Sequence, residues 1–237
     1  WHGCDADPRR VGIILSTALG PHATVFRYVN DLLDYGEAKT SPTVFSQSVH
    51  AAAASMITTA VGARGPVLNL SDLAFPFEEA LTLAGCWLRG GRCDTVLVGA
   101  ADELSEVLAH VVRRKWPQPL PVLGEGAVFF RLARDGGVPV SVGTEPRSGA
   151  VLRLADACAL GREDRGGADA RTRTFTHLWG ATRIGGAFHL AAAWLLRREG
   201  LLPGGAVLPP GGIDVVAACG TRQRVIHFGD GARPHGT

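Results

Sequence analysis

The 237-residue sequence contains no apolar run of the roughly 18 residues that a membrane-spanning helix needs. It also has no CxxC pair, no HExxH and no histidines at metal-ligand spacing, so we expect no metal site. The nucleotide-binding patterns GxGxxG and GxxxxGK[ST] are absent as well. These absences argue against a membrane protein, a zinc protein and the common nucleotide-dependent enzymes.

Charge is sparse and evenly mixed. Lysine and arginine number 24, aspartate and glutamate 22, and together they make up 19% of the chain. No basic stripe stands out, so we expect no nucleic-acid partner. Five cysteines at irregular spacing do not suggest a disulfide framework and are typical of free thiols in a cytosolic protein. The first ten residues lack the apolar stretch of a signal peptide. We therefore expect a cytoplasmic protein without membrane contact or cofactor.

Hydrophobic residues make up 46% of the chain, which predicts a packed core. Short apolar runs rich in β-branched residues predict strands, and apolar residues at helical spacing predict helices. The expected strands are 11–17, 67–70, 94–100, 127–132, 151–157, 213–218 and 223–228. The expected helices are one capped by Thr24, then 45–63, 77–88, 104–113 and 185–199. We expect a surface loop at 161–174 and a disordered tail after Gly229. The alternation of strands and helices favours a layered α/β protein.

The order of these segments resembles a known family. The stretch SPTVFSQSVHAAAASMITTAVGARGPVLNLSDLAFPFEEALTLAGCWLRGGRCDTVLVGAADE, which begins at Ser41, resembles the N-terminal half of β-ketoacyl synthases. LGEGAVFFRL at 123–132 is similar to the strand that closes that half, and THLWGATRIGGAFHLAAAWLLRREGLLPG resembles a late ketosynthase segment. The resemblance implies an α/β, thiolase-like layered fold (α-β-α-β-α) whose second half is shortened. It divides the chain into a ketosynthase-like half at 1–140 and a thiolase-like half at 141–237.

The resemblance also implies which positions would carry catalysis. Counted from the Gly-Pro strand, the nucleophilic cysteine of the family falls on Ala74. In the late segment, Thr176 takes the place of the lysine and Ala181 the place of the histidine. The other family histidine belongs to a segment that this sequence lacks. A methyl group cannot attack a thioester, so we expect no acyl-enzyme at Ala74 and no catalytic residue at these degenerate positions.

Four other residues deserve weighing as reactive groups. Cys219 lies in a segment that resembles the final hairpin of thiolases, which carries a catalytic cysteine, although a small buried residue is the simpler interpretation. His50, His177 and His189 are candidate bases, and a structural role is the simpler interpretation of each.

A ketosynthase-like chain without nucleophile or base resembles a chain length factor of type II polyketide systems. Its shortened second half resembles the truncated partners found in polyene-forming, highly reducing systems such as aryl polyene synthesis. The resemblance implies a heterodimer with an active ketosynthase, indirect contact with an acyl carrier protein, and a role in shaping the pocket for the growing acyl chain. Two alternatives stay open: a thiolase-like acyltransferase or thioesterase that uses Cys219, and a degenerate scaffold.

Two sets of residues would serve that role. In the family the strand before the nucleophile turn pairs with the partner, which implies a dimer edge made of Val67, Leu68, Asn69, Leu70 and Ser71, with the aromatic pair Phe75 and Phe77 just after it. The helix before that strand would limit the tunnel through Ser46, Val49, His50 and Ala53. These four positions share one stripe if residues 45–63 form one helix. Tight helix packing is the competing interpretation of its small side chains.

Overall fold

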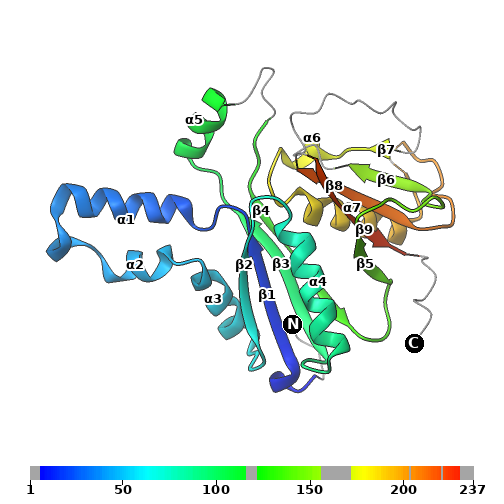
Figure 1. The fold of residues 1–237 in the computed structure, drawn as a ribbon, viewed down its shortest axis with the longest axis horizontal. Coiled ribbons are helices and arrows are strands. Elements are labelled where there is room, and N and C mark those ends of the chain that lie inside the picture. The colour runs from blue at the N-terminus through cyan, green and yellow to red at the C-terminus, as the bar shows by residue number, and fades with distance from the viewer. Residues whose placement is uncertain (1–5, 116–121, 156–171, 203, 220, 230–237) are drawn as a thin grey trace.

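The computed structural model describes residues 6–115, 122–155, 172–202, 204–219 and 221–229 (Figure 1). Two β-sheets form its frame. The first has the order β2-β1-β3-β4 and contains β1 (Val11–Thr17), β2 (Val67–Ser71), β3 (Thr95–Asp102) and β4 (Gly126–Ala133). The second has the order β5-β9-β8-β6-β7 and contains β5 (Val140–Gly143), β6 (Leu152–Ala155), β7 (Thr172–Arg173), β8 (Ile213–Cys219) and β9 (Arg222–Phe228).

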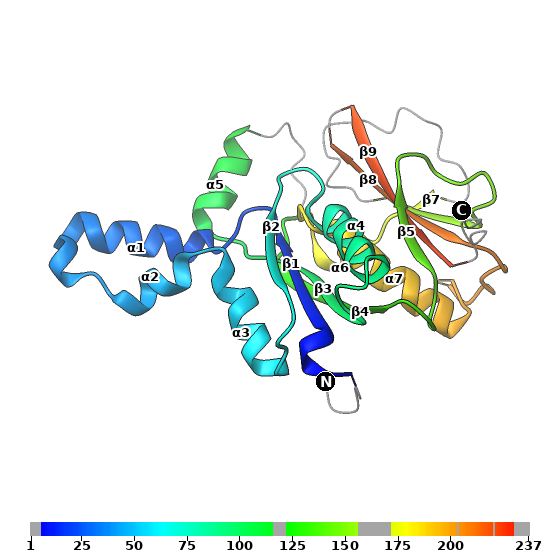
Figure 2. The same cartoon turned by 60° about the horizontal axis from the view of Figure 1, so that its bottom comes forward.

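The helices lie between and beside these sheets. They are α1 (His22–Tyr35), α2 (Pro42–Ser48), α3 (Ala51–Val61), α4 (Pro76–Arg89), α5 (Glu106–Lys115), α6 (Thr176–Trp179) and α7 (Gly185–Glu199), with 3-10 turns at Pro8–Arg10 and Glu37–Lys39. Helices α4 and α7 lie between the sheets, and α3 packs on the other face of the first sheet (Figures 1 and 2). The described residues thus build a helix–sheet–helix–sheet stack, which confirms the thiolase-like fold class; a fifth, helical layer is not among them.

Strand β1 of the first sheet is covered by helices on both of its faces. All seven of its residues are buried. Ile14 packs toward α4, whereas Val11 and Ile13 pack with residues near α3. A parallel strand covered on both faces has no polar side to display, which explains the uninterrupted apolar run in the sequence.

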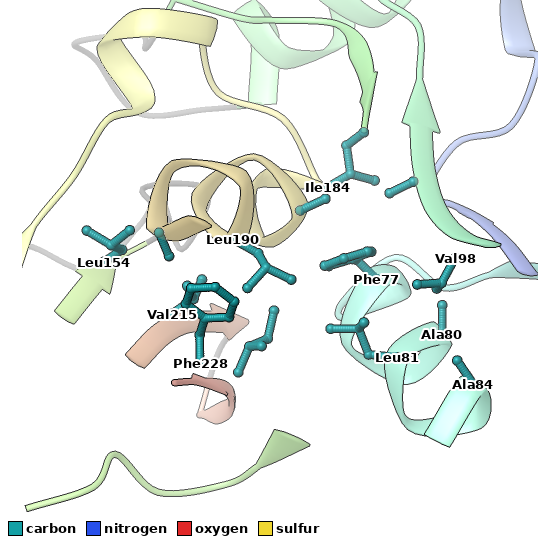
Figure 3. Packing of buried hydrophobic residues seen from close by; sticks show 14 of the residues in the cluster. Phe77, Ala80, Leu81, Ala84, Val98, Leu154, Ile184, Leu190, Val215 and Phe228 are labelled. Atoms are coloured by element: carbon teal, nitrogen blue, oxygen red, sulfur yellow. The ribbon is translucent and has the colours of Figure 1, made fainter. Parts of the chain in front are cut away.

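The main core fills the space between the two sheets (Figure 3). Phe77 on α4 is fully buried, with its ring centroid 5.7 Å from that of Phe130 on β4. Leu190 on α7 and Val215 on β8 belong to the same cluster. Residues of both predicted halves therefore share one core, and the division at 140/141 stays a prediction.

Two helix predictions were wrong. Helix α1 begins at His22 and places Thr24 inside the helix, so Thr24 is not the cap. The predicted helix at 45–63 is two helices, because the backbone is extended at Val49 (φ −82°, ψ 141°). Ser46 and Ser48 each donate a hydrogen bond to the carbonyl three residues earlier, at 2.9 and 2.7 Å. Such local bonds compete with helical backbone bonds and favour ending α2.

Several other boundaries also differ. Strand β3 begins at Thr95, and β5 and α6 were not expected. Residues 172–173 form β7 at the end of the predicted loop. The rest of that loop up to residue 171, and the whole predicted tail after Gly229, lie outside the described residues. Of the helices in the described part of the chain, none is long and apolar enough to cross a membrane.

Candidate functional site

The position expected for a nucleophile lies in the turn from β2 to α4. Ala74 is half-buried there, and it offers only a methyl group. The carboxylate of Asp72 accepts a hydrogen bond from the Ala74 N–H at 3.1 Å and another from the Phe75 N–H at 3.2 Å. The turn therefore has the strand-to-helix form that suits a nucleophile, but its side chain cannot react.

The aromatic residues after this turn are buried within the chain itself, and the dimer edge that they follow stays a prediction. Phe75 is 2% exposed and Phe77 is fully buried. The guanidinium carbons of Arg222 and Arg224 on β9 lie 5.7 and 5.4 Å from the centroid of the Phe75 ring. Arg224 also pairs with Glu79 on α4 at 3.1 Å. Two arginines of the second sheet thus cover the Phe75 ring, a contact that the local sequence does not reveal.

The positions expected for the lysine and the histidine lie around α6. The Thr176 hydroxyl lies 3.0 Å from that of Thr174. Ala181 is 4% exposed; its N–H donates to the Val122 carbonyl at 2.6 Å and its carbonyl accepts from the Gly124 N–H at 3.0 Å. This backbone pairing ties the start of β4 to the end of α6. Neither Thr176 nor Ala181 supplies a general base.

Gly124 is required by that close approach. A Cβ at this position would lie 1.8 Å from the carbonyl oxygen of Trp179. The two loops could not meet with any larger residue there. The GEG sequence at 124–126 is therefore explained by packing between the two halves.

The candidate histidines have three different environments. His189 is fully buried in α7; its Nδ1 lies 2.9 Å from the Gly185 carbonyl and its Nε2 accepts a weak bond from the Phe175 N–H at 3.4 Å. Burial lowers the pKa of His189 to about 4, so the ring is neutral at pH 7. His177 is exposed on α6, and His50 is exposed before α3 with its ring beside Gly20. His189 is a core residue, in line with its simpler interpretation.

Cys219 lies at the end of β8, half-buried. It pairs across the hairpin with Arg222, whose guanidinium lies over the Phe75 ring. The end of the hairpin is thus close to the turn that holds Ala74. A reactive role for Cys219 stays a prediction.

The expected tunnel residues do not lie on one helix. Ser46 is on α2, Val49 and His50 form the break, and Ala53 is on α3. All four are exposed in this chain. Their shared stripe was therefore wrong as helix geometry, while their role in a tunnel stays a prediction.

Helix α1 carries an exposed apolar surface that was not expected from the sequence. Phe26, Val29 and Leu33 are 41%, 39% and 77% exposed, and their spacing places them on one face of α1. On another face of α1, the Tyr28 ring lies 5.3 Å from that of Phe45 on α2. Helices α1 and α2 lie side by side and extend away from the sheets (Figures 1 and 2). We call this helical pair the arm.

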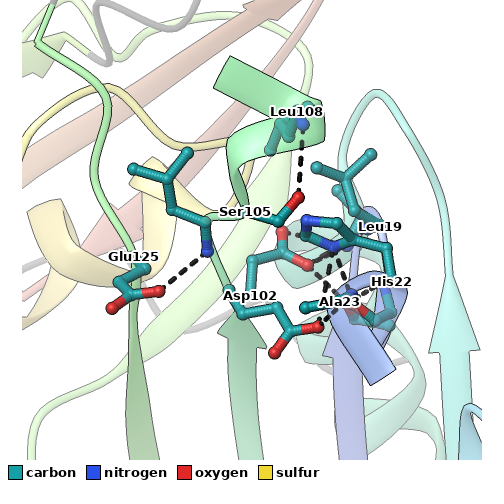
Figure 4. Close-up of polar contacts among 12 residues, drawn as sticks. Leu19, His22, Ala23, Asp102, Ser105, Leu108 and Glu125 are labelled. Carbon is teal, nitrogen blue, oxygen red and sulfur yellow. Dashed lines mark hydrogen bonds and ion pairs between the residues drawn. The ribbon is translucent and has the colours of Figure 1, made fainter. Parts of the chain in front are cut away.

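A carboxylate at the end of β3 anchors the base of the arm (Figure 4). Asp102 accepts hydrogen bonds from the Thr17 hydroxyl at 2.5 Å and from the N–H groups of Ala18 and Leu19 at 3.1 Å. Burial raises the pKa of Asp102, and these hydrogen bonds oppose that rise. The next residue, Glu103, accepts from the Ala23 N–H at 2.7 Å and so serves the helix start that Thr24 was expected to cap. In the sequence, the only local sign of these contacts is the Asp-Glu pair that follows a buried strand.

Strand β2 is at the edge of its sheet, as expected of a dimer edge. Ile13 pairs with Val67 and donates its N–H to the Pro66 carbonyl at 2.9 Å. In a parallel ladder with this register, Leu68 and Leu70 bond to β1, so the N–H and C=O groups of alternate residues point outward. The outward residues are Val67, Asn69 and Ser71.

The described residues were also compared with what a metal ion requires. In the part of the chain that the structure describes, no group of three or more histidine, cysteine, aspartate or glutamate side chains could hold a metal ion. Among the described residues, the candidate site thus consists of a turn with alanine at the expected nucleophile position, two loops with threonine and alanine at the expected lysine and histidine positions, and the edge of β2.

Solved structures of low sequence identity share the fold. The ishigamide ketosynthase/chain length factor is 15% identical with a TM-score of 0.71, and the match covers 95% of this chain and 74% of that chain. A type II PKS acyl-carrier protein in complex with its ketosynthase bound to the hexaketide is 14% identical, with a TM-score of 0.71 and coverage of 95% and 77%. A ketosynthase in complex with its chain length factor from Xenorhabdus doucetiae is 14% identical, with a TM-score of 0.56 and coverage of 92% and 69%.

Sequence comparison identifies the family. A search of curated proteins gave no match. The profile of the family described as "Beta-ketoacyl synthase, N-terminal domain" matches residues 2–122, just over half of the chain. The chain therefore belongs to the β-ketoacyl synthase family.

Proposed function

We propose that this chain is a non-catalytic chain length factor that pairs with an active ketosynthase. The proposal is carried by the side chains at three positions: Ala74, Thr176 and Ala181 stand where the resemblance to β-ketoacyl synthases places the nucleophile, the lysine and the histidine. Acyl transfer needs a nucleophile and a base that activates it. A chain that lacks both cannot condense acyl groups, and its partner supplies the cysteine.

The open edge of β2 supports pairing with a second subunit. Exposed strand edges promote association, and natural proteins cover or block them. Val67 is 43% exposed, and Asn69 presents its backbone N–H and C=O groups away from β1. The apolar face of the arm lies on the same chain and adds Phe26, Val29 and Leu33 to the surface that needs cover. We propose that the ketosynthase covers both.

Two solved neighbours are themselves described as a ketosynthase with a chain length factor, and a third as an acyl-carrier protein bound to its ketosynthase. These descriptions support a ketosynthase as direct partner and an acyl carrier protein as indirect partner. We propose a polyene or aryl polyene system as the setting of this chain, which is what the resemblance of its second half implies. The exposed residues Ser46, Val49, His50 and Ala53 would shape the pocket at the joint between α2 and α3.

Co-expression tests this proposal. The tagged chain is produced alone and together with candidate type II ketosynthases, and the products are separated by size-exclusion chromatography. We expect a soluble one-to-one complex with the ketosynthase, and insoluble or irregular oligomers of the chain alone. A stable, monodisperse monomer that captures no ketosynthase would contradict the proposal.

The alternative enzyme, which would use Cys219, has one observation in its favour: Cys219 lies at the hairpin end that covers the nucleophile turn. Incubation with acyl-CoA or acyl-carrier substrates, followed by peptide mass spectrometry, separates the two functions. An acyl group on Cys219 would favour the enzyme, and an unlabelled chain favours the chain length factor. A scaffold that binds no acyl chain would leave product length unchanged when the pocket residues are altered.

A further inference from the structure

Asp72 holds the backbone donors of the turn between β2 and α4. Its two oxygens accept the N–H groups of Ala74 and Phe75 at 3.1 and 3.2 Å. The next residue, Pro76, has no N–H to offer. One internal carboxylate therefore occupies both adjacent donors before the first turn of a 14-residue helix.

Those donors are the ones that an anion at the turn would need. Backbone N–H groups at a strand-to-helix turn stabilise the oxyanion of acyl transfer. The positive end of a helix also lowers the pKa of a thiol beside it, which makes the thiolate available. A carboxylate fixed at the same donors opposes both effects, because its charge repels a thiolate and its oxygens already hold the N–H groups.

The neighbouring arginines do not pair with the Asp72 carboxylate. Arg224 pairs with Glu79, and the guanidiniums of Arg222 and Arg224 lie over the Phe75 ring. Within the described residues, no cation lies at ion-pair distance from Asp72. Its negative charge at the turn is therefore balanced chiefly by the two N–H groups and by the helix end.

We propose that Asp72 closes this turn to any other anion, so that the turn is blocked by a second residue independently of Ala74. The inference rests on the proposed function, because it explains how a ketosynthase frame is kept from acyl transfer. It predicts that restoring a cysteine by Ala74→Cys is not enough to restore a reactive thiol.

The test measures the reactivity of a thiol at position 74 with iodoacetamide across pH 5 to 10, using about one-unit steps around the ordinary thiol pKa. Peptide mass spectrometry isolates the signal of position 74 from that of the five native cysteines. The full chain carries Ala74→Cys alone, or together with Asp72→Asn. Asp34→Asn, on exposed α1, is the matched control for loss of one negative charge. Asp72→Ser is a second variant that removes the charge and keeps an acceptor for the turn.

Removing the carboxylate should lower the pKa of the introduced thiol by about one unit. Alkylation at pH 7 should become about threefold faster, because the gain in thiolate is partly offset by its lower nucleophilicity. Asp34→Asn should change neither quantity. Equal thiol pKa values with and without Asp72, in both Asp72→Asn and Asp72→Ser, would overturn the inference. The alkylation rate does not depend on pairing with a ketosynthase. A failure of the proposed function would therefore appear separately, as a failure of the chain to co-purify with a ketosynthase.

Discussion

Replacing Asn69 by proline tests whether β2 is the pairing edge. The N–H of Asn69 points away from β1, so proline removes a donor that the chain's own sheet does not use. In a complex that pairs along β2, the change removes one inter-subunit hydrogen bond, at about 1 kcal/mol, and leaves a partner carbonyl unsatisfied, at about 1 to 3 kcal/mol. The total of about 2 to 4 kcal/mol corresponds to roughly 30- to 1,000-fold weaker binding of the ketosynthase.

The assay is the dissociation constant of the co-purified complex, with Asn69→Thr as the matched control because threonine suits a strand and keeps the N–H. Circular dichroism of both variants confirms that the chain is folded. A folded Asn69→Pro variant that binds the ketosynthase as tightly as the Asn69→Thr control would refute the pairing edge.

Three further outcomes follow from the structure. The Arg147 side chain bonds to the fully buried Asp214 at 2.8 Å, and the Arg147 backbone N–H and His227 Nδ1 also contact this carboxylate at 2.6 and 2.9 Å. Because the last two contacts remain, Arg147→Ala should lower the free energy of unfolding by about 1.5 to 3 kcal/mol, measured by urea unfolding of the complex. His189 has a pKa of about 4 in the folded chain against 6.5 in the unfolded chain. Its contribution to the free energy of unfolding is therefore complete above pH 6.5 and is lost as the pH drops from 6.5 toward 4. That loss should reach about 3 kcal/mol, and a urea midpoint with the same pH dependence in His189→Gln would contradict it. Ala53→Phe should shorten the product of the reconstituted heterodimer if this residue lines the tunnel; unchanged length in an intact dimer would show that it does not.

The sequence was enough to predict elements whose signal is local. The buried strands at 11–17 and 213–218, and the helix at 185–199, agree with β1, β8 and α7 within about one residue at each end. Each combines a distinctive apolar pattern with a glycine or proline boundary. Their order, together with the family resemblance, was sufficient for the thiolase-like fold class.

Features set by contacts between distant segments could not be predicted. Phe75 is buried because Arg222 and Arg224 reach it from another sheet. The break at Val49 depends on hydroxyl bonds that a helical pattern of apolar residues does not register. Asp102 serves the base of the arm across more than 80 residues of sequence. The exposure of the apolar side chains on the arm depends on whether another segment packs against them, and the residue pattern of α1 does not encode this.

The central claim is that this chain completes a ketosynthase without performing its chemistry. The most direct measurement is intact-mass spectrometry of the co-purified complex after incubation with an acyl-loaded carrier protein. The account predicts a one-to-one complex in which the ketosynthase alone gains the mass of the acyl group. An acyl group on this chain, at Cys219 or elsewhere, or condensation by this chain without a partner, would contradict it.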